Sequence, residues 1–263
     1  MPGIKSGRSI LNNSLSSDEW HQRFSQQANW TRELRQFVFQ QLSLHAAGRI
    51  LELGCGTGVI TRESNQNTFA KITALDINFS HLRIAHDQDP EVDFICADAF
   101  APPFHKNNFD AVLCHFLLLW LPDPTKCLKN IMHFIKPGGK FIVLAEPDYG
   151  GRIDYPLSLQ EIGQLQQNAL LNQGADPQTG RKLAYYLNQS GFLNVRSGVL
   201  GGLWGNSISS DQIQSEWQIL QHDLGEIISP AKFKQYQEED QKAWQSGERI
   251  QYVPTFYAWG FKA

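Results

Sequence analysis

The sequence predicts an α/β protein with a doubly wound parallel sheet and helices on both faces. Short runs rich in Val, Ile and Phe alternate with helical patterns, and alternation at this spacing is typical of βαβ units. Parallel sheets built from such units are covered by helices on both sides. A glycine-rich stretch directly follows the first strand-like run. The length of 263 residues suits a single domain of this kind.

The first two thirds of the chain contain the clearest elements. Strands are expected at residues 49–53, 71–76, 92–98, 109–116 and 140–146. The best-defined helix covers 123–136, where Leu128, Ile131, Met132 and Ile135 recur on one helical face. The Pro-Gly-Gly motif at 137–139 should end this helix before the next strand.

The two ends of the chain are mainly helical in pattern. Residues 18–42 form a polar-rich helical region that Ser17 or Asp18 would cap. Further helices are expected at 156–174, 181–191, 211–228 and 230–245, a sixth strand at 192–200 and a closing strand at 252–263.

Composition excludes several classes of protein. A formal charge of -3 and a pI near 6.2 leave no basic footprint for nucleic acid. No run of about 18 uncharged apolar residues predicts a membrane span, and the start of the chain lacks the apolar core of a secretory signal. We therefore expect a cytoplasmic protein with neither nucleic acid nor membrane as partner. The oligomeric state is left open.

The four cysteines are spaced singly. Cys55, Cys96, Cys114 and Cys127 form no Cys-x-x-Cys pair, so the spacing predicts neither a zinc site nor a disulfide framework. They are interpreted as reduced core residues, and no metal is expected.

The stretch LELGCGTG at 51–58 predicts a ligand-binding loop. Glycine lets the backbone approach a ligand, and a helix that starts here presents free N–H groups. Gly54, Gly56 and Gly58 follow a G-x-G-x-G spacing, whereas the dinucleotide fingerprint is G-x-G-x-x-G. The shorter spacing favours a ligand without a pyrophosphate group.

Three carboxylates end three successive predicted strands. Glu52, Asp76 and Asp98 should share one crevice, because open α/β sheets bind ligands at the carboxyl ends of their strands. Asp76 could accept both hydroxyls of a ribose, or it could cap the next helix. Asp98 could accept from an adenine amine while Ala99 offers its N–H, or it could cap its own loop.

In this order, the motifs resemble the class I S-adenosylmethionine-dependent methyltransferases, especially the small-molecule branch called type 11. ELGCGTG is similar to the first motif of that family, ALDIN to its ribose motif and CADAF to its adenine motif. FDAVLCHFLLLWLPD and IKPGGKFIVLAE resemble its fourth-strand and fifth-strand regions. The resemblance spans about residues 49–146. It implies a Rossmann-like seven-stranded sheet whose last strand is antiparallel.

The resemblance also implies a set of cofactor contacts, and the pattern of elements along the chain suggests how the domain is divided. Glu52 belongs to the pocket, the methionine part contacts Gly54, Cys55, Gly56 and Thr57, the ribose contacts Asp76 and Ile77, and the adenine contacts Asp98 and Ala99. His115 would lie near the reacting methyl group. Independently of the resemblance, the N-terminal helix is expected to cover the cofactor, because one of its faces carries Arg23, Gln27, Trp30 and Thr31, any of which could meet the methionine carboxylate. Alternatively, this helix could simply pack Phe24, Trp30, Leu34 and Phe37 on the core. We divide the domain into an N-terminal helical cover (1–47), a cofactor-binding core (48–200), a helical lid insertion (201–247) and a closing strand (248–263).

Methyl transfer to an O, N or C atom of a small molecule is the predicted activity. A base is needed only if the accepting atom must lose a proton. The candidates are His115, Tyr149 and Asp148, although His115 could be a core residue, Pro147 to Gly151 is turn-like and Arg152 with Asp154 could be a solvated pair.

The acceptor itself is not defined by the sequence. Several aromatic residues would suit an apolar pocket or could simply belong to the core, namely Trp120, Tyr149, Trp204, Trp217 and Trp244. Two alternative functions stay open. One is an NAD(P)-dependent oxidoreductase on a related fold, and the other is a protein that binds S-adenosylmethionine without turnover.

Overall fold

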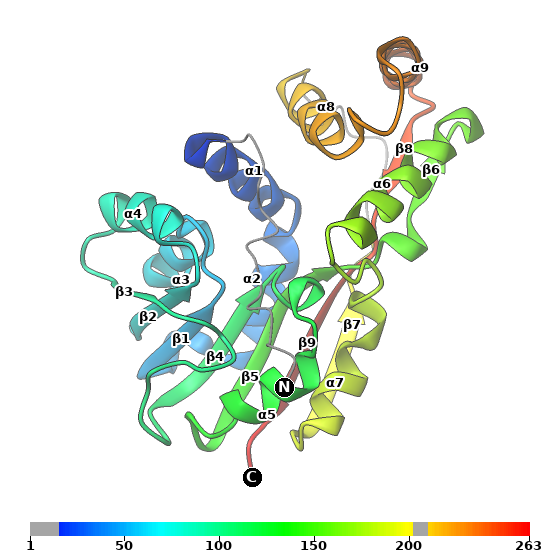
Figure 1. Cartoon of the computed structure of the whole chain (residues 1–263). Helices are drawn as coiled ribbons and strands as arrows, with labels where there is room; N and C mark the ends of the chain where they lie inside the picture. The colour runs from blue at the N-terminus through cyan, green and yellow to red at the C-terminus, as the bar shows by residue number, and fades with distance from the viewer. Residues whose placement is uncertain (1–15, 202–209) are drawn as a thin grey trace, which may run out of the picture.

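The computed structural model describes residues 16–201 and 210–263, and in these ranges a seven-stranded sheet has the order β3-β2-β1-β4-β5-β9-β7 (Figure 1). Its strands are β1 (Arg49–Leu53), β2 (Lys71–Asp76), β3 (Asp93–Cys96), β4 (Phe109–His115), β5 (Ile135–Pro147), β7 (Leu193–Val199) and β9 (Thr255–Phe261). Strands β1 to β5 are parallel, and β9 is antiparallel to both β5 and β7. The predicted mostly parallel sheet with an antiparallel last strand is confirmed.

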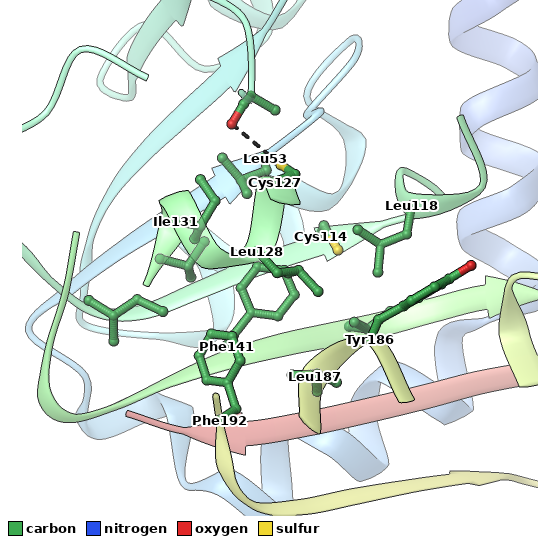
Figure 2. Packing of buried hydrophobic residues seen from close by; sticks show 14 of the residues in the cluster. Leu53, Cys114, Leu118, Cys127, Leu128, Ile131, Phe141, Tyr186, Leu187 and Phe192 are labelled. Carbon is green, nitrogen blue, oxygen red and sulfur yellow. Dashed lines mark hydrogen bonds between the residues drawn. The ribbon is translucent and has the colours of Figure 1, made fainter. Parts of the chain in front are cut away.

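Helices cover both faces of this sheet. One face packs against α1 (Ser17–Trp30), α2 (Arg32–Leu42), α3 (Val59–Asn67) and α4 (Phe79–Gln88), and the other against α5 (Pro124–Ile131) and α7 (Leu183–Gln189). Alternate residues of β4 pack into the cores on the two faces of the sheet, with Leu113 in the first core and Val112 in the second. Figure 2 shows the second core, where Leu128 of α5 and Leu187 of α7 lie over Phe141 of β5. Both faces are therefore buried, as a doubly wound sheet requires.

A helical cap lies beyond the carboxyl edge of the sheet (Figure 1). It contains α6 (Gln160–Asn172), α8 (Ser210–Leu224), α9 (Pro230–Ser246) and a two-stranded sheet of β6 (Ile153–Tyr155) and β8 (Ile250–Tyr252). Short 3-10 helices cover Leu44–Ala46, Leu118–Trp120, Tyr149–Gly151, Leu157–Leu159 and Gly180–Lys182. The cap has its own apolar core, in which the rings of Trp217 and Phe233 meet edge to face at 5.2 Å. The small sheet was not predicted, because three-residue strands leave almost no periodic signal.

Three local predictions were wrong. The cap of α1 is Ser16, not Ser17 or Asp18, because Ser16 and Glu19 form a reciprocal capping box. The N-terminal helical region is interrupted at Thr31, whose hydroxyl donates to the carbonyl of Gln27 and so competes with the helical pattern. Helix α5 ends at Ile131, and Ile135 instead pairs with Phe109 in the sheet.

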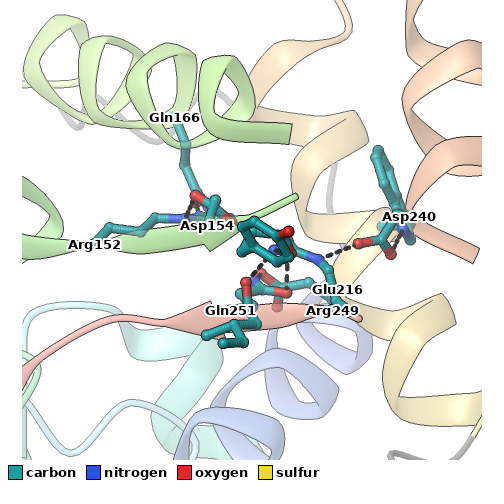
Figure 3. Close-up of polar contacts among 10 residues, drawn as sticks. Arg152, Asp154, Gln166, Glu216, Asp240, Arg249 and Gln251 are labelled. Atoms are coloured by element: carbon teal, nitrogen blue, oxygen red, sulfur yellow. Dashed lines mark hydrogen bonds and ion pairs between the residues drawn. The ribbon is translucent and has the colours of Figure 1, made fainter. Parts of the chain in front are cut away.

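The interpretation of Arg152 and Asp154 as a solvated pair was also wrong. Both side chains are buried, and Arg152 Nε donates to Asp154 Oδ2 at 2.6 Å. Arg249 donates to Asp154 Oδ1 at 2.9 Å and to Asp240 Oδ1 at 2.6 Å (Figure 3). This network joins β6 and β8 to α9, and Gln166 connects it to α6 by accepting from Arg152 at 2.5 Å.

The cysteines are free, as predicted from their spacing. Three of them are buried, whereas Cys96 is exposed at the end of an outer strand and is not a core residue. The described ranges contain no cluster of three or more His, Cys, Asp or Glu suited to a metal ion. None of the helices in those ranges has both the length and the apolarity that crossing a membrane requires.

Candidate functional site

A cavity of about 250 Å³ lies at the carboxyl edge of the sheet, between the glycine loop and α1. Several predicted site residues line it, namely Gln27, Glu52, Gly54, Cys55, Gly56, Asp76, Ile77, His115 and Tyr149. They come from α1, the ends of β1, β2 and β4, and the segment after β5. The topology therefore brings together residues that are far apart in the sequence.

The glycine loop is held against β2. Gly54, Gly56 and Gly58 have φ values of 68°, 52° and 80°, a region that glycine adopts without strain. The N–H of Gly54 donates to the carbonyl of Leu75 at 2.7 Å. A side chain at Gly56 would meet the ring of Phe24 from α1 at 2.9 Å. The loop therefore combines a fixed backbone with close approach from its covering helix.

The carboxylate of Asp76 binds the backbone of both the glycine loop and the start of α4. Its Oδ2 accepts from the N–H of Gly56 and its Oδ1 from the N–H of Asn78, both at 2.8 Å. The cap of α4 is Asn78, whose side chain accepts from Ser80 and His81. Asp76 is therefore not the helix cap. Each of its oxygens retains a lone pair that could accept a hydroxyl.

Glu52 contributes a buried carboxylate to the cavity. Burial raises the pKa of Glu52 to about 8, and the nearby side chain of Thr61 opposes this shift. Its Oε2 has no hydrogen-bond partner among the described residues. Burial, with the neighbouring carboxylates, also raises the pKa of the Cys55 thiol. The Cys55 thiol is therefore protonated, and Glu52, whose raised pKa also favours its protonated form, has one oxygen free for a polar group of a ligand.

His115 lies at the end of β4 and lines the cavity. Its Nε2 is 2.8 Å from the hydroxyl of Thr31, and its ring stacks on Phe116 at 4.5 Å. Desolvation, with a smaller contribution from the charge of Arg35, lowers the pKa of His115 to about 3. The imidazole is therefore neutral near pH 7, and it holds α1 and β4 together.

The end of β5 supplies three acidic or phenolic groups with different surroundings. Glu146 is buried and accepts from the N–H groups of Leu117 and Leu118 at 2.7 and 2.6 Å, and burial raises its pKa to about 8. Asp148 is buried in a bidentate pair with Arg181 and lies outside the cavity wall. Tyr149 lines the cavity, and burial raises its pKa to about 12. Of these three residues, only Tyr149 lines the cavity.

Four predicted cofactor contacts lie outside the wall. The side chain of Asp98 accepts from the N–H of Phe100 at 2.8 Å, as a loop cap would, and Ala99 is buried in the core. Thr57 is buried beside His21, with 2.8 Å between Oγ1 and Nδ1. Trp30 is 49% exposed. The cofactor roles of these residues stay predictions.

Of the aromatic residues that were expected to suit an apolar pocket, some line the cavity and others do not. Trp120 lines the cavity, whereas Trp217 is buried in the cap and donates to Asp240 at 2.9 Å. Trp244 is half-buried on α9, and Trp204 lies outside the described residues. Wall residues that sequence reasoning did not single out for the site include Trp20, Phe24, Asn78, His81, Phe116, Leu119 and Leu170. The spacing of Trp20, Phe24 and Gln27 follows one face of a helix and could have indicated the first two.

The fold is the one found in class I S-adenosylmethionine-dependent methyltransferases. Residues 51–143 match the family model described as a methyltransferase domain. The chain is 34% identical over 122 residues to the demethylmenaquinone methyltransferase of Renibacterium salmoninarum, which covers 46% of this chain and 51% of that protein. It is 28% identical over 118 residues to the ubiquinone/menaquinone biosynthesis C-methyltransferase UbiE of Pseudomonas paraeruginosa, covering 42% and 46%. The chain thus spans about half the length of these relatives.

Solved structures agree on the fold. The [4+2]-cyclase SpnF has a TM-score of 0.57 at 20% identity, with 88% of this chain and 80% of that chain covered. Phosphoethanolamine N-methyltransferase 2 of Haemonchus contortus, solved with phosphomonomethylethanolamine and S-adenosylhomocysteine, has a TM-score of 0.58 at 13% identity, covering 100% and 61%. Because a cyclase and a methyltransferase share this fold, the fold alone does not specify the reaction.

S-adenosylmethionine is the cofactor of such methyltransferases, and the chemistry of the residues in the cavity wall suits it. Glu52 has an unpartnered buried oxygen, which can accept from an amino group. Asp76 has free lone pairs beside the cavity for the ribose hydroxyls. The glycines leave the backbone open to close approach.

Proposed function

We propose that this chain is an S-adenosylmethionine-dependent methyltransferase that acts on a small molecule. The observation that supports it best is the cavity in which the glycine loop, Glu52 and Asp76 meet under α1. Backbone of Gly54 and Gly56 would face the methionine part of the cofactor, Glu52 its amino group and Asp76 its ribose. Ile77, which is 73% exposed at the cavity edge, would pack beside the adenosine.

The covering helix α1 must move for ligands to enter. The cavity of about 250 Å³ is smaller than the roughly 300–1,000 Å³ typical of sites for drug-sized ligands. Trp20 and Phe24 occupy its outer wall from α1. An opening of α1 would admit the cofactor, and its return would exclude water from the reacting atoms.

The bound cofactor supplies a methyl group that its positive sulfur has already activated. The chain then has to orient the acceptor, and positioning alone provides a large part of the acceleration. His115 is a weak base with its pKa near 3, and Tyr149 keeps its proton near pH 7 with its pKa near 12. Asp148 is bound to Arg181. These environments favour an acceptor that reacts without a strong protein base.

An apolar acceptor suits the other side of the cavity. Phe116, Leu119 and Leu170 pack together there with Tyr149, and Trp120 completes the wall. The relatives are named for methylation of demethylmenaquinone and for ubiquinone and menaquinone biosynthesis. We therefore propose a small acceptor with an apolar ring, and we leave the accepting atom open.

Two measurements test this proposal. Calorimetry should show micromolar binding of S-adenosylhomocysteine, and binding of NAD in its place would contradict the methyltransferase assignment. An assay with labelled S-adenosylmethionine over a panel of ring-containing metabolites should transfer the label to an acceptor. Cofactor binding with no transfer across the panel would support a binding protein without turnover.

A further inference from the structure

The wall of the cavity changes in chemistry from one side to the other. Glu52 and Asp76 lie beside the glycine loop, and Tyr149 lies among apolar residues after β4 and β5. Arg23 of α1 is the one Arg or Lys in the described wall. The two histidines of the wall, His81 and His115, have lowered pKa values because of desolvation. Arg23 is therefore the fixed positive charge that a ligand meets in this cavity.

Arg23 is buried without a hydrogen bond to any other described residue. Its side chain is 10% exposed, and its closest carboxylate oxygen is Asp223 Oδ2 at 3.8 Å, which is beyond hydrogen-bond distance. Asp223 already accepts from Gln166 at 3.3 Å and from Gln173 at 3.4 Å. A guanidinium has five N–H donors, and no other described residue accepts from those of Arg23. Arg23 thus has donors available for a ligand oxygen.

Tyr149 provides a second available donor in the same wall. Its hydroxyl makes no hydrogen bond to another residue in the described ranges, and it lies in the electrostatic field of Arg23. Glu216 and Asp223 of α8 and Arg152 after β5 also act on this hydroxyl. Because the flanking side chains are apolar, a ligand oxygen here would find its polar partners in Arg23 and Tyr149.

Arg23 also borders a second, larger space. This hollow of about 1750 Å³ lies between α1, α6, α8 and α9. A ring held near Arg23 could therefore carry a substituent on the side away from the glycine loop. The cap then contributes to the acceptor site in addition to covering it.

We propose that Arg23 and Tyr149 bind an oxygen of the acceptor, and that the acceptor is an apolar ring with a phenolic or enolic hydroxyl. This inference rests on the proposed methyltransferase function. Arg23 stabilises the oxygen as it gains negative charge, and Tyr149 donates a second hydrogen bond to it. A protein base becomes unnecessary, in keeping with the weak bases of this site, because the positive charge of Arg23 lets the hydroxyl release its proton to water before α1 closes.

The test compares 1-naphthol with 1-methoxynaphthalene, which lacks the hydroxyl proton. Both are titrated into the full chain saturated with S-adenosylhomocysteine, with tryptophan fluorescence as the signal because Trp20 and Trp120 line the cavity. The wild type should bind 1-naphthol at least fivefold more tightly. Arg23→Gln should abolish this preference, Arg23→Lys should retain part of it, and Tyr149→Phe should reduce it two- to fivefold. Arg83→Gln, at an exposed position, removes the same charge and should leave the preference unchanged.

Two results would overturn this proposal while sparing the methyltransferase function. One is an unchanged 1-naphthol preference in Arg23→Gln. The other is a tenfold loss of S-adenosylhomocysteine affinity in that variant with no loss for 5′-methylthioadenosine, which lacks the carboxylate. Arg23 would then bind the methionine carboxylate of the cofactor. Failure of S-adenosylhomocysteine to bind the wild type would instead contradict the proposed function itself.

Discussion

The backbone N–H of Gly56 donates to the Asp76 carboxylate at 2.8 Å and so ties the glycine loop to the end of β2. The second carboxylate oxygen accepts from Asn78, which begins α4. One side chain therefore fixes both segments that form this side of the cavity. Asp76 organises the pocket before any ligand is bound, and any contact of Asp76 with a ribose comes in addition.

Replacement of Asp76 should weaken the cofactor site. Asp76→Ala removes the acceptor of two backbone donors and any ribose contact, so we expect S-adenosylhomocysteine affinity to fall by more than tenfold, or about 1.4 kcal/mol. Asp76→Asn keeps one acceptor oxygen and should lose less. Calorimetry measures both, and an unchanged dissociation constant in Asp76→Ala would remove Asp76 from the pocket.

Gly56→Ala should loosen the covering helix. The new methyl group would meet the Phe24 ring at 2.9 Å, and the φ of 52° disfavours a side chain. We expect at least tenfold weaker binding of S-adenosylhomocysteine because α1 can no longer close on the loop. Gly138→Ala is the matched control, since Gly138 also has a positive φ of 73° but open space around it. The control should lose about 1 kcal/mol of stability without loss of affinity.

The arrangement of strands and helices in the sheet could be predicted from the sequence more fully than the contacts of the site residues. The alternation of strands with helices and the order of motifs predicted the sheet, because burial on both faces leaves a strong apolar pattern. Asp98 was expected to end its strand, but β3 ends at Cys96, and Asp98 lies in the loop that follows, where it accepts from the N–H of Phe100. The apolar pattern of a strand predicts roughly where a side chain near its end lies. The conformation of the following loop decides which group that side chain contacts, and it leaves no periodic pattern in the sequence.

The contacts of the N-terminal helical region and of the cap were the least predictable from the sequence. Arg23 and Thr31 were recognised only as members of one helical face, and their partners Asp223 and His115 come from other elements. The buried pair of Arg152 and Asp154 looked like surface residues because charged residues are seldom buried. Its burial depends on Arg249, almost a hundred positions later in the chain, which no local pattern connects to it.

The free energy of unfolding should fall as the pH is lowered through about 6.5, because of His115. Its pKa of about 3 in the folded protein is below the usual 6.5 of an unfolded histidine, so the unfolded chain binds the extra proton. Stability from this group is present above pH 6.5 and falls by about 1.4 kcal/mol between pH 7.5 and 5.5. Urea unfolding at both pH values should show this loss in the wild type relative to His115→Gln.

The wild type has to be compared with His115→Gln, because two buried glutamates change the stability with pH in the opposite direction. Glu52 and Glu146 have pKa values raised to about 8, so the folded state retains their protons and their contribution rises as the pH falls. The difference between the wild type and His115→Gln cancels these effects. His105→Gln, at an exposed position, should behave as the wild type. Parallel pH dependence in wild type and His115→Gln would show that His115 is accessible to protons in the folded state.

Asp154 should be essential for the stability of the cap. It is the shared acceptor of Arg152 and Arg249, and all three side chains are at most 3% exposed. Asp154→Asn would leave the buried guanidinium of Arg152 without its ion-pair partner and Arg249 with Asp240 alone, and removing one partner of a buried ion pair typically costs about 3–5 kcal/mol. Denaturant unfolding should therefore show a large loss of free energy of unfolding.

An exposed ion pair provides the control for Asp154→Asn. Lys71 and Asp93 are 2.9 Å apart with side chains 64% and 54% exposed, so Asp93→Asn should change stability by less than about 0.5 kcal/mol. Because the Asp154 network joins β6 and β8 to α9 and α6, proteolysis of Asp154→Asn should also begin within the cap. Equal stabilities of the two variants would mean that water reaches the Asp154 network and that the cap is held by its apolar core alone.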